Sequence, residues 1–319
     1  MRLYTLNREG NYYKGNLHTH TTVSDGRYSP LDTIERYKRN GYHFLAITDH
    51  MVYSYFSECE NAEFLSIPAA EVHTSKGGAG LHHMIAFGDP KTTKFGNGER
   101  LDQAFFNQMS TQELIDYLLE RDNLVIYNHP HWSRDCIRDI IDLKNLVGIE
   151  IYNHNCQIEW RCGNAEVFYD HLLWHENYVW CFATDDAHGG GGTNDYCGGY
   201  ITVKTNDFSH KGILTAIRDG SFYASASREG ETAPIIRDFI FEDGIAKLWC
   251  SESRDVNFFA GQKSYPTIFP GGYSFRSFQA GKSCPITYAE FKVPEDAKFV
   301  KVSAQDFAGN ISWCQPIFL

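Results

Sequence analysis

The sequence feature that most restricts the fold is a series of seven short apolar runs, each with polar, potentially metal-binding residues at one end. Runs such as HFLAITDH, NLVIYNHPH and YVWCFATDDAH contain few polar residues before that end. Short continuous apolar runs are typical of strands that are buried on both faces of a parallel sheet. We therefore expect seven strands, at residues 15–20, 43–50, 64–73, 83–87, 124–129, 147–153 and 178–188.

Helices are expected between several of these strands. Ser29 and Pro30 have the residue types of a helix cap and a first-turn proline, and Gly41 ends the same segment. Further helices are expected after the capping box of Ser110 and Glu113 and over residues 164–176 and 209–219. Strands that alternate with helices indicate a parallel α/β architecture. Because polar residues end nearly every strand, a β/α barrel is favoured over an open doubly wound sheet, which would draw its site mainly from one crevice.

The pattern changes after about Ala233. Segments such as IIRDFIFEDG, IAKLWCSES and TYAEFKV are β-like, and no convincing helix interrupts them. Such a series is typical of a small β-sandwich. We therefore expect two domains, a barrel over residues 1–233 and a sandwich over residues 234–319. The segment at residues 2–7 is also β-like and lies outside the barrel series, so we expect it to pair with the sandwich.

Charge and composition limit the partners. A formal net charge of −11 argues against an extended nucleic-acid-binding surface, although a short nucleotide could enter a pocket in which metal ions supply positive charge. No apolar run approaches the roughly 20 residues that span a bilayer, and the first residues lack the apolar stretch of a signal peptide. We therefore expect no membrane segment and a cytoplasmic location, and the sequence predicts no particular oligomeric state.

Missing motifs argue against several functions. The sequence has neither a Gly-rich P-loop nor a dinucleotide fingerprint, which argues against kinases and dehydrogenases. Its nine cysteines are odd in number and scattered, without a C-x-x-C pair. The cysteines therefore predict neither a disulfide framework nor a zinc ribbon.

The strongest local signal for chemistry is the pair His18 and His20. Side chains two residues apart in a strand point the same way, so these imidazoles can reach one metal ion together. The pair alone would be weak, but similar residues recur at later strand ends, and side chains at the same end of successive parallel strands converge on one pocket. The full candidate set is His18, His20, Asp25, His50, Glu71, His83, His129, Asp186 and His188.

These motifs resemble a known family. The H-x-H and S-D-G opening, the T-D-H motif, a Glu followed by a later His, N-H-P-H and a final D-x-H are similar to the motif series of the PHP (polymerase and histidinol phosphatase) superfamily over roughly the first 230 residues. The resemblance implies a distorted seven-stranded β/α barrel with a di- or trinuclear metal centre. The closing run, residues 302–318, is similar to the end of PHP-type hydrolases grouped with carbaryl hydrolase, which join a barrel to a sandwich.

The resemblance also implies a ligand assignment. His18, His20, Glu71 and Asp186 would surround a first metal ion, Glu71 would bridge to a second ion held by His83 and His129, and Asp25, His50 and His188 would hold a third. The complete set favours three ions over two. Nitrogen and oxygen ligands without thiolate suit Mn²⁺, Fe²⁺ or Zn²⁺.

Other residues leave alternatives open. His82 and His83 point to opposite faces of a strand, so only one can be a ligand, and His83 is preferred because His-Met-Ile-Ala resembles the family's His followed by an apolar run. We expect Asp49 and Asp185 to orient imidazoles from behind the ligands. Candidate substrate contacts are His131, Arg134 and His154, with His73 and His154 as possible proton donors and Arg161 and Lys76 as further cations on loops.

The expected function is hydrolysis. Two close metal ions would bind a bridging water, lower its pKa and present hydroxide to the substrate, with Glu71, Asp186 and His188 as catalytic residues. The leading hypothesis is a phosphoesterase that acts on a small phosphorylated compound or a short nucleotide. The alternatives are hydrolysis of a carbamate, ester or amide by the same hydroxide, and a non-catalytic metal-binding scaffold.

Overall fold

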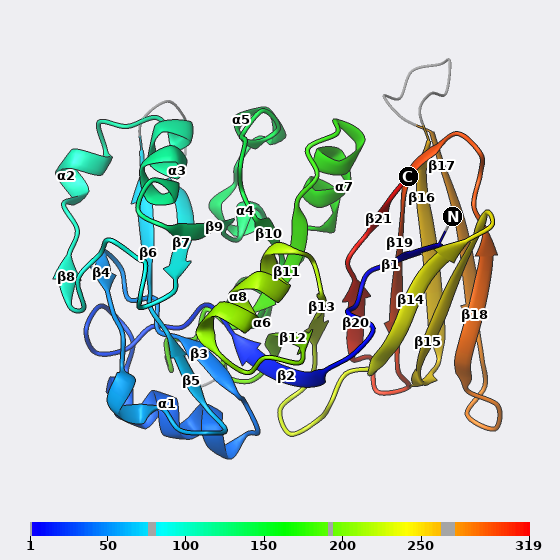
Figure 1. Ribbon diagram of the computed structural model, residues 1–319, viewed down its shortest axis with the longest axis horizontal. Coiled ribbons are helices and arrows are strands. Elements are labelled where there is room, and N and C mark those ends of the chain that lie inside the picture. Colours follow the sequence, from blue (N-terminus) through cyan, green and yellow to red (C-terminus); the bar gives the residue numbers. More distant parts are fainter. Residues whose placement is uncertain (1, 76–80, 191–193, 263–271) are drawn as a thin grey trace.

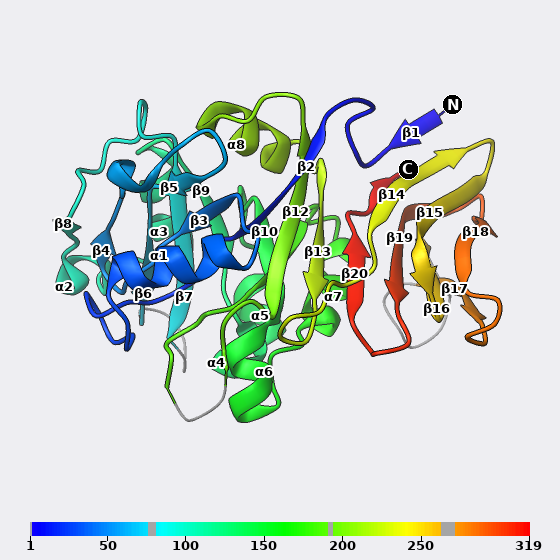
Figure 2. The same cartoon turned by 90° about the horizontal axis from the view of Figure 1, so that it is seen from below.

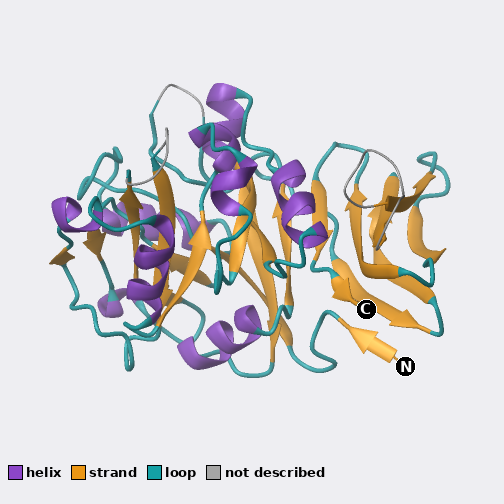
Figure 3. Ribbon diagram, turned by 90° about the horizontal axis from the view of Figure 1, so that it is seen from above, coloured by secondary structure: helices purple, strands orange, loops and turns teal. Residues whose placement is uncertain are grey.

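The computed structural model describes residues 2–75, 81–190, 194–262 and 272–319. One end of the molecule combines strands with helices, which confirms the expected mixed α/β class (Figure 1). The other end begins at β14 (Ile236–Glu242), and its described residues form strands and turns (Figure 3). Both chain termini lie at this all-strand end (Figure 1).

The largest sheet runs through both ends of the molecule. At one edge, β2 (Asn11–Asn16), β3 (Phe44–Ala46) and β5 (Leu65–Ile67) are parallel neighbours. The sheet continues from β2 through β12 (Gly199–Thr205), β13 (Phe222–Ala226), β20 (Ile311–Cys314), β19 (Ala297–Gln305), β16 (Asp255–Gln262) and β17 (Gly272–Gln279), with β21 (Ile317–Phe318) beside β19 (Figure 2). The sequence analysis missed β12 and β13, which connect the two ends.

A second sheet of five strands carries much of the site. Its order is β11 (Trp180–Thr184), β10 (Gly148–Asn153), β9 (Asn123–Tyr127), β7 (His82–Gly88) and β6 (Ala69–Thr74). The expectation of parallel strands is wrong for β7, which runs antiparallel to both neighbours. The connection from β6 to β7 is too short for the helical crossover that a parallel pair requires. Because β7 is reversed, its first residues lie at the same edge as the last residues of β6.

Together these strands do not form one closed sheet in the described part of the chain. Single bridges link the ends of the two sheets, one between Thr19 and Ala187 and one between His50 and Glu71. The closed, seven-stranded form of the barrel therefore stays a prediction. Small strands β4 (Val52–Tyr53) and β8 (Glu99–Arg100) pair with each other, and η1 (Ser57–Cys59) is a short 3-10 helix.

The capped helices lie where local sequence signals placed them. α1 (Pro30–Arg39) begins after Ser29, whose side chain accepts a hydrogen bond from the Asp32 amide. α3 (Thr111–Leu119) begins with the expected capping box of Ser110 and Glu113. The other predicted helices are α7 (Glu166–Trp174) and α8 (His210–Arg218), whereas α2 (Gln103–Phe106), α4 (Pro130–Ser133), α5 (Ile137–Ile140) and α6 (His154–Trp160) were not expected. No helix in the described ranges is long and apolar enough to cross a membrane.

The four-stranded sheet at the all-strand end contains the first strand of the chain. Its order is β1 (Arg2–Tyr4), β14, β15 (Ile245–Ser253) and β18 (Ile286–Lys292). The antiparallel pairing of β1 with β14 confirms the expected partner of the N-terminal segment. Buried residues of this sheet, such as Phe239 and Leu248, share one apolar core with Phe258 and Val300 of the large sheet.

The two ends of the molecule are hydrogen-bonded to each other. β13 pairs antiparallel with β20, so the large sheet crosses the boundary that the sequence placed near Ala233. Gln315 adds a second link to the five-stranded sheet, because its side chain bonds both the N–H and the C=O of Cys181 in the edge strand β11, each at 2.9 Å. The all-strand end therefore helps to hold the strand that leads into Asp186.

Candidate metal centre

The loops and strand ends at one edge of the two sheets bring the nine predicted ligands together. β2 leads into the segment of His18, His20 and Asp25, and β3 leads into His50. Glu71 lies within β6, His83 at the start of β7, His129 after β9, and Asp186 and His188 after β11. Three overlapping groups of these side chains have ligand atoms within 4.8 Å of one another.

The first group consists of His18, His20, Glu71 and Asp186. Nε2 of His18 and Nε2 of His20 are 3.2 Å apart. Oδ1 of Asp186 lies 3.0 Å from His18 Nε2 and 3.1 Å from His20 Nε2. All four side chains are buried, so their polar atoms face one another away from water. This arrangement can surround one ion with two imidazoles and two carboxylates.

The second group consists of His50, Glu71 and His83, and His129 lies beside it. Oε1 of Glu71 is 2.9 Å from His83 Nδ1 and 3.2 Å from His129 Nε2. Oε2 of Glu71 is 3.0 Å from His50 Nδ1 and 3.2 Å from His20 Nε2. One carboxylate that contacts imidazoles on both oxygens has the geometry of a bridge between two ions.

The third group consists of His20, Asp25, His50 and His188. Oδ2 of Asp25 lies 3.6 Å from His50 Nε2 and 3.5 Å from His188 Nε2. His20 belongs to both this group and the first, and His50 also contacts Glu71. The three groups therefore form one continuous cluster and not three separate pockets.

Two residues of the cluster have a backbone conformation that side chains rarely adopt. The φ angle is 24° at His129 and 54° at Asp186. Left-handed backbone conformations of this kind cost roughly 1–3 kcal/mol outside glycine and occur preferentially at functional sites. The Pro130 ring that follows His129 starts α4 and helps to fix this turn.

Glu150 holds the cluster from behind, and the sequence analysis missed it. Its fully buried carboxylate accepts hydrogen bonds from His18 Nδ1 at 2.6 Å and from Thr184 Oγ1 at 2.7 Å. Its other oxygen accepts from the His129 amide at 2.9 Å and from Asn153 Nδ2 at 3.0 Å. The bond to Nδ1 directs Nε2 of His18 at the cluster. A lone acid inside the apolar run GIEIYN was the available signal.

The carboxylates expected to orient imidazoles have another role. Asp49 accepts hydrogen bonds from the Thr21 amide at 2.7 Å and from the Ser24 hydroxyl at 2.7 Å, in the loop that carries Asp25. Asp185 accepts from the amides of Gly198 and Gly199 at 2.8 and 2.6 Å. The expectation for Asp49 and Asp185 is therefore wrong, since these contacts shape loops that surround the ligands.

The two adjacent histidines of β7 point in different directions. Nδ1 of His82 lies 2.5 Å from the Tyr127 hydroxyl and 3.5 Å from Asp135 Oδ1, away from Glu71. His83 faces Glu71, as preferred from the sequence. His82 therefore belongs to a separate polar network with Tyr127, whose hydroxyl donates to Asp135.

A cavity of about 450 Å³ opens over the cluster. Besides seven of the proposed ligands, its lining includes Trp132, Asn155, Cys156, Glu159 and Trp160, none of which was a sequence candidate. The described lining does not include the candidate substrate contacts. His131 Nδ1 lies 2.9 Å from the Asn164 carbonyl, and Arg134 donates a hydrogen bond to the His131 carbonyl. His154 Nδ1 lies 3.0 Å from the Tyr152 hydroxyl. Lys76 lies outside the described residues.

The donor set fits divalent metal ions. Within the described residues, the buried His83 Nε2 has no hydrogen-bond partner, as expected for an atom that binds a cation. The Cys156 thiol is nearby, but burial and the carboxylate of Asp186 raise its pKa far above the ordinary value. The available donors are therefore imidazole nitrogen and carboxylate oxygen.

The carboxylates of the cluster raise the pKa of two of its imidazoles, those of His50 and His188. Burial raises the pKa of Glu71, but His18, His83 and His50 outweigh this effect and hold that pKa well below its ordinary value. Burial lowers the pKa of His50, but Glu71 and Asp25 outweigh it and raise the pKa to about 10. The carboxylates of Asp25 and Asp186 likewise overcome burial at His188 and raise its pKa to about 9.

These shifts predict pH-dependent metal affinity. Below pH 9 the imidazoles of His50 and His188 carry protons in the metal-free protein, and a metal must displace them. We expect affinity for Mn²⁺ or Zn²⁺ to rise with pH between about 6 and 8, roughly tenfold per unit for each proton released. Competition titrations against a chelator of known pH dependence measure this slope. A flat profile would contradict protonated imidazoles in the empty cluster.

The chain is similar to several solved structures. A two-domain protein from Bacteroides vulgatus, containing a predicted PHP-like metal-dependent phosphoesterase, shares 14% identity and a TM-score of 0.50, over 96% of this chain and 95% of that chain. A proposed metal-dependent phosphoesterase from Bifidobacterium adolescentis shares 17% identity and a TM-score of 0.43, over 63% of this chain and 96% of that chain. An amidohydrolase from Chromobacterium violaceum with bound sulfate and no metal shares 16% identity and a TM-score of 0.41, over 55% of this chain and 87% of that chain.

The first of these likenesses shows a shared two-part fold, which extends over almost the whole chain. No curated protein matches the sequence significantly. The resemblance of the closing run to the carbaryl-hydrolase group stays a prediction. The PHP domain family matches residues 16–177, slightly more than half of the chain, and this segment carries His18 through His129 of the cluster. The chain therefore belongs to the PHP domain family, and its candidate site is a cluster of histidines and carboxylates that could hold metal ions.

Proposed function

We propose that this protein is a metal-dependent phosphoesterase that hydrolyses a small phosphate ester or a short nucleotide. The observation that carries the proposal is the position of Glu71, which is buried and lies 2.9 to 3.5 Å from the imidazoles of five histidines. No single structural role requires so many imidazoles around one carboxylate. Membership of the PHP domain family and the donor set support a metal-dependent hydrolase.

We assign one metal position to each of the three groups of ligands in the cluster. Divalent Mn, Fe or Zn ions bound there would polarise a phosphoryl oxygen and lower the pKa of water. Glu71 serves two positions because each of its oxygens faces different imidazoles. Asp186 contributes to the first position and His188 to the third, so both lie where a substrate oxygen would approach. We propose Glu71, Asp186 and His188 as the catalytic residues.

Residues outside the ligand set hold the proposed ligands in position. Glu150 fixes the ring of His18, and Asp49 fixes the loop that carries Asp25. All nine proposed ligands precede residue 190, and residues 234–319 contain no histidine. We therefore propose that residues 1–233 form the catalytic domain in a distorted barrel, and that residues 234–319 form a β-sandwich that stabilises it and supplies no ligand.

Metal analysis combined with a substrate panel tests the proposed function. We expect two or three equivalents of transition metal per chain after reconstitution, measured by inductively coupled plasma mass spectrometry. The reconstituted protein should hydrolyse phosphate esters, and removal of the metal with a chelator should abolish this activity. Less than one equivalent after reconstitution, or phosphate esterase activity that survives the chelator, would contradict the proposal.

A second candidate is hydrolysis of a carbamate, ester or amide by the same centre. One observation favours it: the cavity lining, within the described residues, contains carboxylates and imidazoles but no lysine or arginine. A neutral substrate would need no cation beyond the metals, whereas many phosphate sites add arginine or lysine. Activity against carbamates or carboxylic esters, without activity against phosphate esters, would identify this candidate as the function.

A further inference from the structure

Two tryptophans line the cavity over the metal cluster. Trp132 lies on α4 and is 39% exposed, and Trp160 is the last residue of α6 and is 62% exposed. Both helices are short insertions directly after the strands β9 and β10. Tryptophan is usually largely buried, so two exposed indoles at one cavity require an explanation beyond packing of the protein itself.

Contacts with metal ligands hold Trp132 in place. Its ring centroid is 5.0 Å from that of His129 at an interplanar angle of 78°, and 6.2 Å from that of His83 at 63°. These edge-to-face contacts are a favoured geometry for aromatic pairs. The indole is therefore fixed beside two imidazoles that face Glu71. It lies next to the position where hydrolysis would occur.

The charge of the cavity restricts the rest of the ligand. Glu159, next to Trp160, also lines the cavity, and it belongs to none of the three ligand groups. The described lining offers no lysine or arginine to balance a second anionic group at this side. The cavity of about 450 Å³ has the size of a small-molecule site. The outer part of the site is therefore aromatic and negatively charged.

We propose that the substrate joins its hydrolysable group to a planar aromatic ring system, which stacks on Trp132 and Trp160, and that this ring portion carries no second phosphate. Stacking of planar rings on aromatic side chains contributes to binding without requiring a particular ring chemistry. The identity of the hydrolysed bond rests on the proposed function, but the aromatic site does not depend on it. Trp132 and Trp160 are then specificity residues, and Glu159 selects against additional anionic groups.

Binding of two phosphonates, which are not hydrolysed, tests the aromatic site. The probes are phenylphosphonate and methylphosphonate, and affinity for the metal-reconstituted protein is measured by calorimetry. We expect the phenyl compound to bind about tenfold more tightly, because stacking strengthens binding by roughly this factor or more. In the Trp132→Ala and Trp160→Ala double variant the two affinities should become equal, through weaker binding of the phenyl compound alone. Trp132→Phe should keep most of the preference, since it retains a ring.

The matched control is Trp249→Ala, which removes an indole from β15 at the all-strand end and should leave the preference unchanged. Equal binding of the two phosphonates by the unsubstituted protein, or no binding of either, would overturn the aromatic site. A preference that persists in the double variant would also overturn it. If phenylphosphonate is preferred but no phosphate ester is hydrolysed, the phosphoesterase proposal fails while the aromatic site stands.

Discussion

Replacement of Glu71 by glutamine should lower the turnover of the metal-reconstituted protein by about 1000-fold or more, since a lost metal bridge removes several kcal/mol of transition-state stabilisation. The substitution keeps the shape of the side chain but removes its charge. Glu71 is only 1% exposed, and its two oxygens face His83 and His129 on one side and His20 and His50 on the other. The amide of glutamine would replace one of the two oxygens with an NH₂ group. That group would face one pair of histidines, where a metal-bridging side chain must present an oxygen.

The measurements are steady-state kinetics and metal content of the same preparations. We expect the Glu71→Gln protein to retain a folded circular-dichroism spectrum and to bind fewer metal equivalents than the unsubstituted protein. Glu63→Gln, which changes an exposed glutamate just before β5, is the matched control and should retain full activity and metal content. Turnover of Glu71→Gln at the unsubstituted rate would remove Glu71 from the bridging position.

The sequence was most informative where structure depends on near neighbours. The caps of α1 and α3 involve residues three positions apart, and both helices begin where these signals predicted. The direction of β7 was predicted wrongly although the information was local. The gap between Glu71 in β6 and His83 in β7 is too short for a helical crossover, so an antiparallel hairpin was the available solution.

The metal ligands were recognisable because imidazoles and carboxylates at strand ends are costly to bury without a shared partner. The residues that hold them were harder to find, because their contacts join distant parts of the sequence. Glu150 reaches His18 across 132 positions, and Asp49 reaches Thr21 across 28. Trp132 and Trp160 lie on short helices without a capping box, although Asn153 caps the helix of Trp160. Their exposure, which suggests their role, is visible only in the folded chain.

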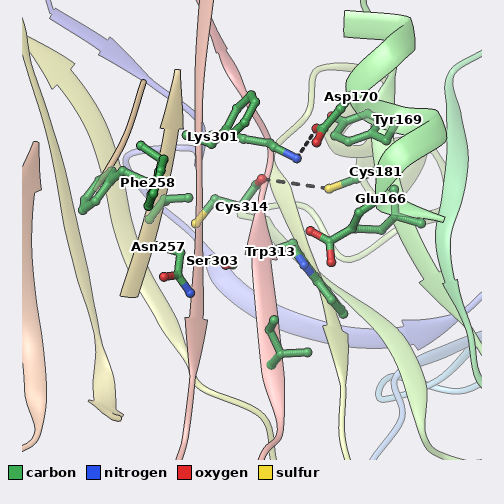
Figure 4. Close-up of a pocket in the computed structure, with 15 residues that line it drawn as sticks. Glu166, Tyr169, Asp170, Cys181, Asn257, Phe258, Lys301, Ser303, Trp313 and Cys314 are labelled. Atoms are coloured by element: carbon green, nitrogen blue, oxygen red, sulfur yellow. Dashed lines mark hydrogen bonds and ion pairs between the residues drawn. The ribbon is translucent and has the colours of Figure 1, made fainter. Parts of the chain in front are cut away.

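The separation of the chain at Ala233 was inferred from a change in pattern. β12 and β13 were missed, and with them the continuity of the large sheet from β2 to β20. A change from helical to β-like sequence marks where helices stop, but it does not show which strands pair. The contact surface between the two ends contains the ion pair of Lys301 with Asp170 and the approach of the Cys181 thiol to the Cys314 carbonyl (Figure 4).

Replacement of Gln315 by alanine tests whether this contact surface stabilises the metal site. Gln315 is 1% exposed, and its side chain satisfies both backbone polar groups of Cys181 at the edge of the five-stranded sheet. Alanine would leave a buried donor and a buried acceptor unpaired, which costs about 2–6 kcal/mol for the two groups. We expect the midpoint of urea unfolding of the metal-free protein to fall, with little change in the slope of the transition.

Gln279→Ala, at an exposed position of β17, is the matched control and should change the free energy of unfolding by less than about 0.5 kcal/mol.

The expected effect of Gln315→Ala extends to the metal site, because β11 continues from Cys181 to Thr184 and leads directly into Asp186. A looser edge strand would let Asp186 move from His18 and His20, so metal affinity should fall along with stability. Reduced stability with unchanged metal affinity would mean that the all-strand end supports the fold without positioning the ligands. An unchanged stability would mean that water replaces the Gln315 side chain at β11, and that the two ends of the molecule depend on the pairing of β13 with β20 instead.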